Sequence, residues 1–321
     1  MTTAAARLLS TPGLDVYVGL VERRLEQLVG GDGIVSQAGA VTLRSGGKRL
    51  RPMLVHLAAP ASVRDRPELV AAGCAVELVH MATLVHDDQL DAAPLRRGHP
   101  TIWRTHGRHV ATATGDHLFA RAFGELVTTG SMEAVTVLSD ACLGLARGEI
   151  LQREQAGDPS VTADQYLERC RLKTGRLFAA AVMLGGVLGR LDGESTRRLG
   201  EFGVALGLAF QIADDVLDCD GQPDTTGKPL GTDLLDGTVT LPLLLAAARD
   251  PEVASVIARG AAPADVLPTL ARVARCGAVR DARERALEQA AVAAAHLCEL
   301  DPTVDTRALH EVVRGVVDRR A

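Results

Sequence analysis

Apolar residues recur at intervals of three and four along nearly the whole chain, a spacing that places them on one face of an α-helix. Alanine, leucine, arginine and glutamate, which have high helix propensity, are abundant between them. We find no convincing alternation of apolar and polar residues of the kind that marks a half-buried strand. The sequence therefore predicts an all-α protein, a bundle of many helices. The expected helices span residues 15–29, 35–43, 50–59, 67–90, 107–128, 132–155, 163–188, 193–218, 240–248 and 279–297.

The sequence shows no sign of a boundary between domains. Breaks that contain glycine or proline are short and evenly spread, and apart from two acidic clusters no segment repeats. A chain of 321 residues can bury a large core. We therefore expect a single all-α domain over residues 1–321. The formal net charge of −5 at pH 7 argues against nucleic acid as a partner.

Cysteine usage and hydropathy indicate a cytoplasmic protein. Six cysteines are scattered without a Cys-x-x-Cys pair, which favours reduced thiols over disulfides or zinc ligands. The first residues lack the long apolar core of a signal peptide. The most apolar stretch, residues 178–189, is too short to cross a bilayer, so we expect no transmembrane segment.

Two clusters of the pattern Asp-Asp-x-x-Asp are the strongest functional signal. On a helix, each would place three carboxylates on one patch, where like charges repel. Oxygen ligands of this kind suit Mg²⁺, which keeps several waters and takes a few carboxylates plus substrate phosphates. One cluster alone could equally be a solvated helix end, but two clusters in apolar surroundings predict a metal site that binds a diphosphate. The candidate metal ligands are Asp87, Asp88, Asp91, Asp214, Asp215 and Asp218.

Basic residues recur close to the acidic clusters. The segment Gly46–Pro52 carries three cations, Arg96 and Arg97 follow the first cluster, and Lys173 lies within an expected helix. Arginine binds phosphate oxygens through two hydrogen bonds, and lysine acts as a mobile point charge. A basic run can also be a solvated face, and this reading stays open for Arg49. Cations beside metal-binding carboxylates nevertheless predict small polyanionic substrates, more than one of them.

A long polar segment, residues 219–237, follows the second cluster directly and carries Lys228. Long loops without secondary structure are uncommon in compact domains and are usually functional or disordered. We therefore expect an active-site loop here.

In order and spacing, a series of motifs from Gly46 to Leu244 resembles the trans-prenyltransferases, also called isoprenyl diphosphate synthases. The motifs are GGKRLRP, ELVHMATLVHDDQLDAAPLRRGHPT, GDHLFARAF, GEILQ, LKTGRLFAAA, FQIADDVLD and GKPLGTDLLDGTVTLP. The resemblance implies an all-α bundle around a deep central cavity and a homodimer. It also implies a Mg²⁺-dependent, head-to-tail condensation of isopentenyl diphosphate with an allylic diphosphate.

The resemblance further implies a role for each matching residue. Three Mg²⁺ ions per active site would be bound directly by Asp87, Asp91 and Asp214, with the other three aspartates completing or supporting these sites. The residues implied to hold the allylic diphosphate are Arg96, Lys173, Gln211 and Lys228, the last three being the catalytic candidates; Thr174 is a further substrate-binding candidate. The residues implied to hold isopentenyl diphosphate are Lys48, Arg51, His80 and Arg97. His80 lies seven residues before Asp87 on the same helix face, which favours a ligand over a core histidine.

Product length is expected to depend on the side chains that precede Asp87 on the same helix face. Ala82 and Thr83 lie about one turn before it, and Val79 and Leu78 lie another turn back. An aromatic residue at Ala82 or Thr83 would close the pocket, whereas these small residues leave it open. All four also suit ordinary core packing. We expect a polyprenyl product longer than fifteen carbons.

Two positions depart from the family pattern. Thr238 stands where the family often has lysine, which removes one cation from the allylic diphosphate. Gln89 stands where the family often has an apolar residue.

Two other functions stay open at this point. A class I terpene cyclase also uses an aspartate-rich motif and Mg²⁺, but cyclases tend to guide cations with aromatic faces, and aromatic residues make up only 2% of this chain. A non-catalytic subunit of a heteromeric prenyl synthase is the third reading, which Thr238 keeps open.

Overall fold

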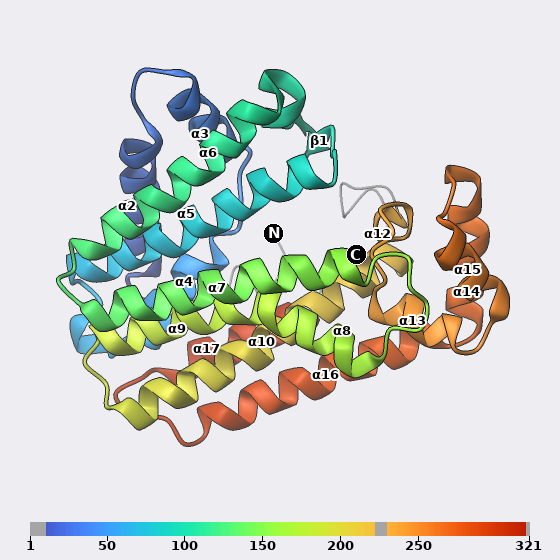
Figure 1. The fold of residues 1–321 in the computed structure, drawn as a ribbon. Helices are drawn as coiled ribbons and strands as arrows, with labels where there is room; N and C mark the ends of the chain where they lie inside the picture. Colours follow the sequence, from blue (N-terminus) through green and yellow to red (C-terminus); the bar gives the residue numbers. More distant parts are fainter. Residues whose placement is uncertain (1–10, 222–229, 319–321) are drawn as a thin grey trace. The chain divides into compact units, whose positions relative to one another are not determined.

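The structure is a computed structural model that describes residues 11–221 and 230–318. Regular structure in these residues is almost entirely helical, with one short β-hairpin (Figure 1). The elements up to the middle of the chain are α2 Leu14–Val29, α3 Ile34–Arg44, α4 Leu50–Ala58, η1 Ala61–Val63, α5 Pro67–Leu90, β1 Leu95–Arg96, β2 His99–Pro100, α6 Ile102–Val127 and α7 Met132–Glu154. The later elements are α8 Ala163–Cys170, η2 Arg171–Gly175, α9 Arg176–Leu188, α10 Gly193–Asp220, α12 Thr232–Leu235, α13 Leu241–Ala247, α14 Pro251–Arg259, η3 Pro263–Asp265, α15 Val266–Arg275, α16 Ala278–Leu297 and α17 Thr306–Val317.

The predicted all-α fold is confirmed, and each expected range coincides with helix in the structure. Two expected helices differ in detail. The range 163–188 is interrupted by a π-helical turn, Arg171–Gly175, which separates α8 from α9. Helix α6 begins at Ile102, five residues before the expected start at residue 107. Gly107 has a non-helical conformation (φ 81°, ψ 170°) that kinks the helix, and the sequence therefore predicted only the part that follows this kink.

Besides the short α12, the helices α14, α15 and α17 were missing from the sequence expectation. All three are short, and proline or glycine residues separate them from their neighbours, so the apolar repeat is brief. Helix α14 begins with Pro251 at its first turn, and the Asp250 carboxylate accepts a hydrogen bond from the Glu252 N–H. The strands β1 and β2 contain two residues each, too few to show alternation.

The expected long loop, residues 219–237, is partly helical. Helix α10 continues to Asp220, and the short helix α12 occupies Thr232–Leu235. The expectation of an irregular segment is therefore wrong at these residues. Residues 222–229, which include Lys228, lie outside the described part of the chain.

Contacts divide the chain into two compact units. Within the described residues, the first unit comprises 11–142, 177–200 and 299–311, and the second comprises 143–176, 201–221, 230–298 and 312–318. The expectation of a single domain stays a prediction.

Helix α5 is the central element of the first unit and packs against α2, α4 and α6 (Figure 1). Most of its residues are buried around its whole circumference, as in a helix that is enclosed by neighbours. Gly73 allows α2 to approach closely, because a Cβ there would lie 2.2 Å from the hydroxyl of Tyr17. That hydroxyl donates a hydrogen bond of 2.9 Å to the Leu69 carbonyl. Length and composition would also let α5 cross a membrane, but buried core helices commonly share both properties, and 72% of the apolar window is buried here.

The second unit has its own apolar core. Leu208 and Ile212 of α10 pack there with buried side chains of α8, α13, α15 and α16. Tyr166 of α8 is the largest of these side chains and is fully buried. The core therefore fixes the orientation of α10 in the turns directly before the second acidic cluster.

Candidate active site

The first acidic cluster forms the C-terminal end of α5. Asp87 and Asp91 lie one turn apart and are partly exposed, and the Asp91 N–H donates to the Asp87 carbonyl at 2.8 Å. Asp88 is buried, and its carboxylate accepts a hydrogen bond of 2.6 Å from Nε of Arg96. Asp87 and Asp91 are thus partly exposed at the helix end, while Asp88 fixes the guanidinium of Arg96 in β1.

The turn that carries Arg96 and Arg97 is tied to α5 and α6. The Ala93 N–H donates to the Asp88 carbonyl at 2.9 Å. The Ala93 carbonyl in turn accepts hydrogen bonds of 2.7 Å from the Thr101 hydroxyl and from Nε1 of Trp103. The single tryptophan of the chain therefore holds the segment that positions these two arginines.

Gln89 has a structural partner. Its side-chain carbonyl accepts a hydrogen bond of 3.0 Å from the Thr112 hydroxyl of α6. An apolar residue could not accept this bond, which accounts for glutamine at the position.

His80 lies on α5 among several arginines. Burial lowers its pKa well below the usual value, and the charges of Arg51, Arg97, Arg96 and Arg49 lower it further. The imidazole is therefore neutral at pH 7 and can both donate and accept a hydrogen bond.

Arg51 is the clearest candidate for anion binding in this cluster. Burial lowers its pKa to about 10, so it remains a cation at pH 7. Its guanidinium lies 4.8 Å from the centre of the Phe178 ring, which favours a cation over its face. Its Nε is buried and has no hydrogen-bond partner among the described residues. A buried charged donor without a partner is costly, and an anionic ligand would satisfy it.

The second acidic cluster lies at the C-terminal end of α10, and its three aspartates have different surroundings. Asp214 is exposed. Asp215 is buried and accepts hydrogen bonds from the Tyr166 hydroxyl at 2.7 Å and from Nε2 of Gln211 at 2.8 Å. Asp218 accepts the N–H groups of Thr232 and Asp233 at 3.1 and 3.2 Å, and so it fixes the start of α12.

Burial sets the charge state of Asp215. It raises the pKa to about 7, and the hydrogen bonds from Tyr166 and Gln211 offset part of this rise because they favour the carboxylate. The negative charge of Asp214 acts in the same direction as burial. Asp215 therefore ties the end of α10 to Tyr166 of α8 from within the core.

Lys173 and Thr174 lie in the π-helical turn between α8 and α9. Such turns recur at functional sites because they redirect side chains out of the regular helix. The Lys173 ammonium donates to the Glu149 carboxylate of α7. Burial alone would raise the pKa of Glu149, but the cations of Lys173 and Arg153 outweigh it and hold the pKa below its usual value.

The π-helical turn is joined to the second acidic cluster by hydrogen bonds. The Thr174 hydroxyl donates to Oε1 of Gln211 at 2.7 Å, and Nε2 of Gln211 donates to Asp215. Gly148 makes the close approach of α7 possible, because a Cβ there would lie 2.6 Å from the backbone nitrogen of Lys173. Within the second unit, the structure thus brings together the residues that the sequence singled out at 173–174, 211 and 214–218.

The expected chain-length positions are embedded in the first unit. Ala82 and Val79 are buried, and Thr83 is partly buried with its hydroxyl donating to the His80 carbonyl at 2.8 Å. Thr238 of the second unit is partly buried, and its N–H donates to the Asp233 carbonyl at 2.8 Å.

The acidic clusters offer carboxylate oxygens as the donors for a metal ion. Among residues 11–221 and 230–318, no group of three or more Asp, Glu, His or Cys side chains is arranged to hold a metal ion on its own. Magnesium commonly takes only one or two protein carboxylates and completes its shell with water and substrate phosphates. The partly exposed Asp87 and Asp91 and the exposed Asp214 fit that requirement.

Several residues that hold the site together were not foreseen from the sequence. They are Trp103, Glu149 and Tyr166, together with Glu22 and Glu77, which accept hydrogen bonds from the Arg49 guanidinium. The rarity of aromatic residues was a usable signal for Trp103 and Tyr166, since the chain has one tryptophan and two tyrosines. Glu77 and Glu149 lie within the motifs ELVHMATLVHDDQLDAAPLRRGHPT and GEILQ, which was a usable signal, whereas Glu22 gave none because it lies in a helix where glutamate is common.

The all-helical fold with two acidic helix ends and adjacent cations is that of the isoprenoid synthases. A family model described as Polyprenyl synthetase matches residues 32–268. The chain therefore belongs to the polyprenyl synthetase family and is a prenyltransferase.

Individual relatives agree with this assignment. The octaprenyl diphosphate synthase of Escherichia coli is 35% identical over 300 residues, which cover 92% of this chain and 93% of the relative. The heptaprenyl diphosphate synthase component 2 of Geobacillus stearothermophilus is 40% identical over 241 residues, 75% of each chain. A solved structure of a polyprenyl synthase from Caulobacter crescentus, complexed with calcium and isoprenyl diphosphate, is similar with a TM-score of 0.90 at 35% identity, covering 99% of this chain and 98% of that one.

Proposed function

We propose that the chain condenses isopentenyl diphosphate head-to-tail with an allylic diphosphate and forms a polyprenyl diphosphate longer than fifteen carbons. The cluster of arginines around the neutral His80, with the unsatisfied Nε of Arg51, is the observation that carries this proposal. Long-chain synthases among the relatives support the length of the product.

The first unit supplies the proposed site for isopentenyl diphosphate. Lys48, Arg51 and Arg97 bind the diphosphate oxygens, and the neutral imidazole of His80 donates one further hydrogen bond. None of these groups needs to lose its proton during the reaction, so their role is to bind and orient. Orientation of the double bond toward the allylic carbon converts a bimolecular encounter into a step within one complex.

The allylic diphosphate is proposed to be held by Arg96, Lys173 and Lys228, with Thr174 and Gln211 beside them. Mg²⁺, when bound to Asp87, Asp91 and Asp214, supplies positive charge that stabilises the departing diphosphate. Lys173 adds charge to the same leaving group, and its ion pair with Glu149 keeps the ammonium oriented before substrate arrives.

The proposed assembly is the one that the family resemblance implies, and the proposed location is the one that cysteine usage indicates. We propose a single domain that forms a homodimer in the cytoplasm and requires three Mg²⁺ ions per active site. All six cysteines are free thiols, which fits a reducing compartment.

The test is a product assay with the purified chain alone. Farnesyl diphosphate, isopentenyl diphosphate and Mg²⁺ are supplied, and released diphosphate and product mass are measured. Products that grow by five-carbon units support the proposal. Consumption of the allylic substrate without isopentenyl diphosphate would indicate a cyclase instead. No product without a second protein would indicate a subunit of a heteromeric enzyme, as the name of the Geobacillus relative suggests for that protein.

A further inference from the structure

Arg49 lies in the middle of the basic segment Gly46–Pro52, yet its side chain points into the protein. It is only 7% exposed. Its Nε donates to Oε1 of Glu22 at 2.6 Å, and its Nη1 donates to Oε1 of Glu77 at 2.9 Å. Its Nη2 donates to the Leu43 carbonyl at 3.1 Å and to Oε2 of Glu22 at 3.4 Å. Acceptors from α2, α3 and α5 thus surround one guanidinium.

This arrangement leaves Arg49 little capacity to bind a ligand. A guanidinium has five N–H donors, and four of them have protein acceptors here. The neighbouring Arg51 shows the opposite pattern, since its Nε is buried without a hydrogen-bond partner among the described residues. Two arginines that are two positions apart in the sequence therefore have different tasks.

The backbone at Arg49 depends on the same contacts. Arg49 directly precedes α4 and has a left-handed conformation (φ 48°, ψ 35°), which is unfavourable for a residue with a side chain. Gly47 provides the space that the guanidinium needs, because a Cβ at Gly47 would lie 2.8 Å from Nη1 of Arg49. The ion pairs with Glu22 and Glu77 offset the cost of this conformation and fix the direction in which α4 begins.

We propose that Arg49, held by Glu22 and Glu77, is a positioning residue that fixes the backbone so that Lys48 and Arg51 bind the same diphosphate. This inference rests on the proposed function, since it assigns that diphosphate to isopentenyl diphosphate. It distinguishes Arg49 from the cations that contact the substrate.

The direction in which Glu22→Gln changes the affinity for isopentenyl diphosphate shows whether Arg49 positions the segment or contacts the substrate. If Arg49 had to leave its carboxylates to bind the substrate, Glu22 would compete with the diphosphate, and Glu22→Gln would tighten binding. If Arg49 positions the segment, Glu22→Gln loosens it and weakens binding. Glu22 is 37% exposed, so this substitution buries no new unpaired charge and should leave the fold intact.

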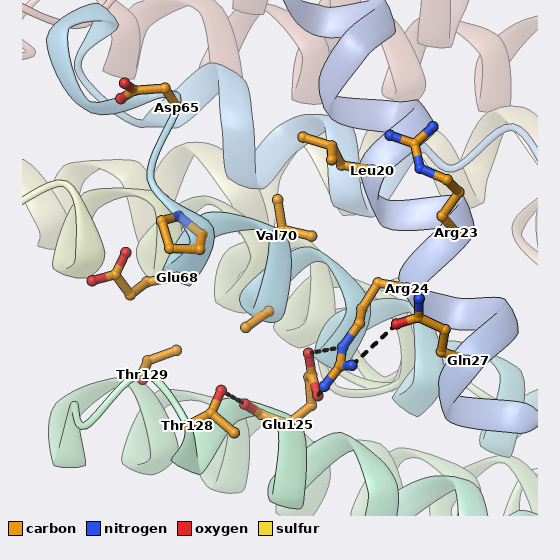
Figure 2. A pocket seen from close by; sticks show the side chains of 12 residues that line it. Leu20, Arg23, Arg24, Gln27, Asp65, Glu68, Val70, Glu125, Thr128 and Thr129 are labelled. Carbon is orange, nitrogen blue, oxygen red and sulfur yellow. Dashed lines mark hydrogen bonds and ion pairs between the residues drawn. The ribbon is translucent and has the colours of Figure 1, made fainter.

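The chain contains a matched control. Arg24 of α2 binds both carboxylate oxygens of Glu125 of α6, each at 2.8 Å, and Glu125 is 6% exposed (Figure 2). This pair lines a groove of about 700 Å³ beside Val70, near the start of α5. Asp87 lies 17 residues further along that helix, about 25 Å at 1.5 Å per residue. The control therefore has the same chemistry as the Arg49–Glu22 pair, and its groove lies beside the start of α5, at the end opposite to the first acidic cluster.

The experiment measures binding of isopentenyl diphosphate by calorimetry in EDTA, so that no metal contributes. The variants are Arg49→Lys, Glu22→Gln, the double variant, and the controls Arg24→Lys and Glu125→Gln. Arg49→Lys keeps the charge but cannot reach three acceptors at once, and we expect about tenfold weaker binding. Glu22→Gln should weaken binding about threefold. The double variant should bind no more weakly than Arg49→Lys, because both changes disturb the same group of hydrogen bonds around Arg49.

Steady-state kinetics, with Mg²⁺ and both substrates present, provide a second measurement. Arg49→Lys and Glu22→Gln should raise KM for isopentenyl diphosphate while leaving kcat and the KM for the allylic substrate within about twofold. The control variants should leave binding unchanged, even where they lower the unfolding temperature.

The outcomes separate the two proposals. Unchanged or tighter binding by Glu22→Gln, with normal binding by the unaltered chain, overturns the role of Arg49 and leaves the proposed function intact. Equal weakening by Glu125→Gln also overturns it, because the effect would then be a general loss of stability. No binding by the unaltered chain would overturn the proposed function and this inference with it.

Discussion

Asp215 should make the stability of the metal-free protein fall as the pH rises through neutrality. Its pKa is about 7 in the folded state and 3.8 for the unperturbed group, so the folded protein holds this proton more tightly than the unfolded chain does. A raised pKa contributes stability that is fully present below about pH 4 and is lost as the pH passes 7. From these two values, the loss between pH 5.5 and 8.5 is about 2 kcal/mol.

The assay is urea unfolding in EDTA at the two pH values, for the unaltered chain and for Asp215→Asn. The variant cannot titrate at this position, so the difference in unfolding free energy between pH 5.5 and 8.5 should be smaller by about 2 kcal/mol in the variant. Histidines and other groups titrate in both proteins and cancel in this comparison. Parallel pH profiles of the two proteins would refute the assignment of a raised pKa to Asp215.

The two tyrosines of the chain provide a matched second test. Tyr166→Phe removes a hydrogen bond that favours the carboxylate, so the pKa of Asp215 should rise further and the fall in stability should move to higher pH. Tyr17→Phe removes a hydrogen bond of similar length to the Leu69 carbonyl. It should cost about 1 kcal/mol at both pH values without changing the profile. An equal shift of both profiles would contradict the argument.

Three further predictions concern turnover and product. Asp87→Ala and Asp214→Ala should each abolish turnover while the circular dichroism of the helices is retained, and activity that persists in EDTA would contradict metal dependence. Thr238→Lys should lower KM for the allylic substrate more than for isopentenyl diphosphate. The gain in binding free energy should be at most roughly 1.5 kcal/mol, because the position is partly exposed. An unchanged KM would show that other groups already neutralise this diphosphate. Ala82→Phe should shorten the products to the farnesyl or geranylgeranyl stage, as measured by mass spectrometry. It should also lower the unfolding free energy by about 1–3 kcal/mol, because Ala82 is fully buried. An unaltered product distribution would show that the tail does not pass Ala82.

The helical repeat was sufficient to predict most of the fold, because burial of one helix face leaves a periodic record in the sequence. Helix α5 was predicted at its observed bounds, 67–90. The repeat failed where a helix was short, as in α14, or where geometry changed inside a helix, as in the π-helical turn 171–175. A π-helical turn adds one residue to a turn without altering composition, so a continuous helix and an interrupted one look alike in sequence.

The sequence by itself determined which residue types the site contains, since the two acidic clusters and the basic motifs have fixed spacing. It could not determine how residues of one motif divide their tasks. Asp214 and Asp215 are adjacent, but one is exposed and the other is buried against Tyr166. Arg49 and Arg51 share one segment, but only Arg49 is enclosed by acceptors. Burial and hydrogen-bond partners come from helices distant in the chain, so tertiary packing alone decides which charged groups are already neutralised by the protein and which remain for a ligand.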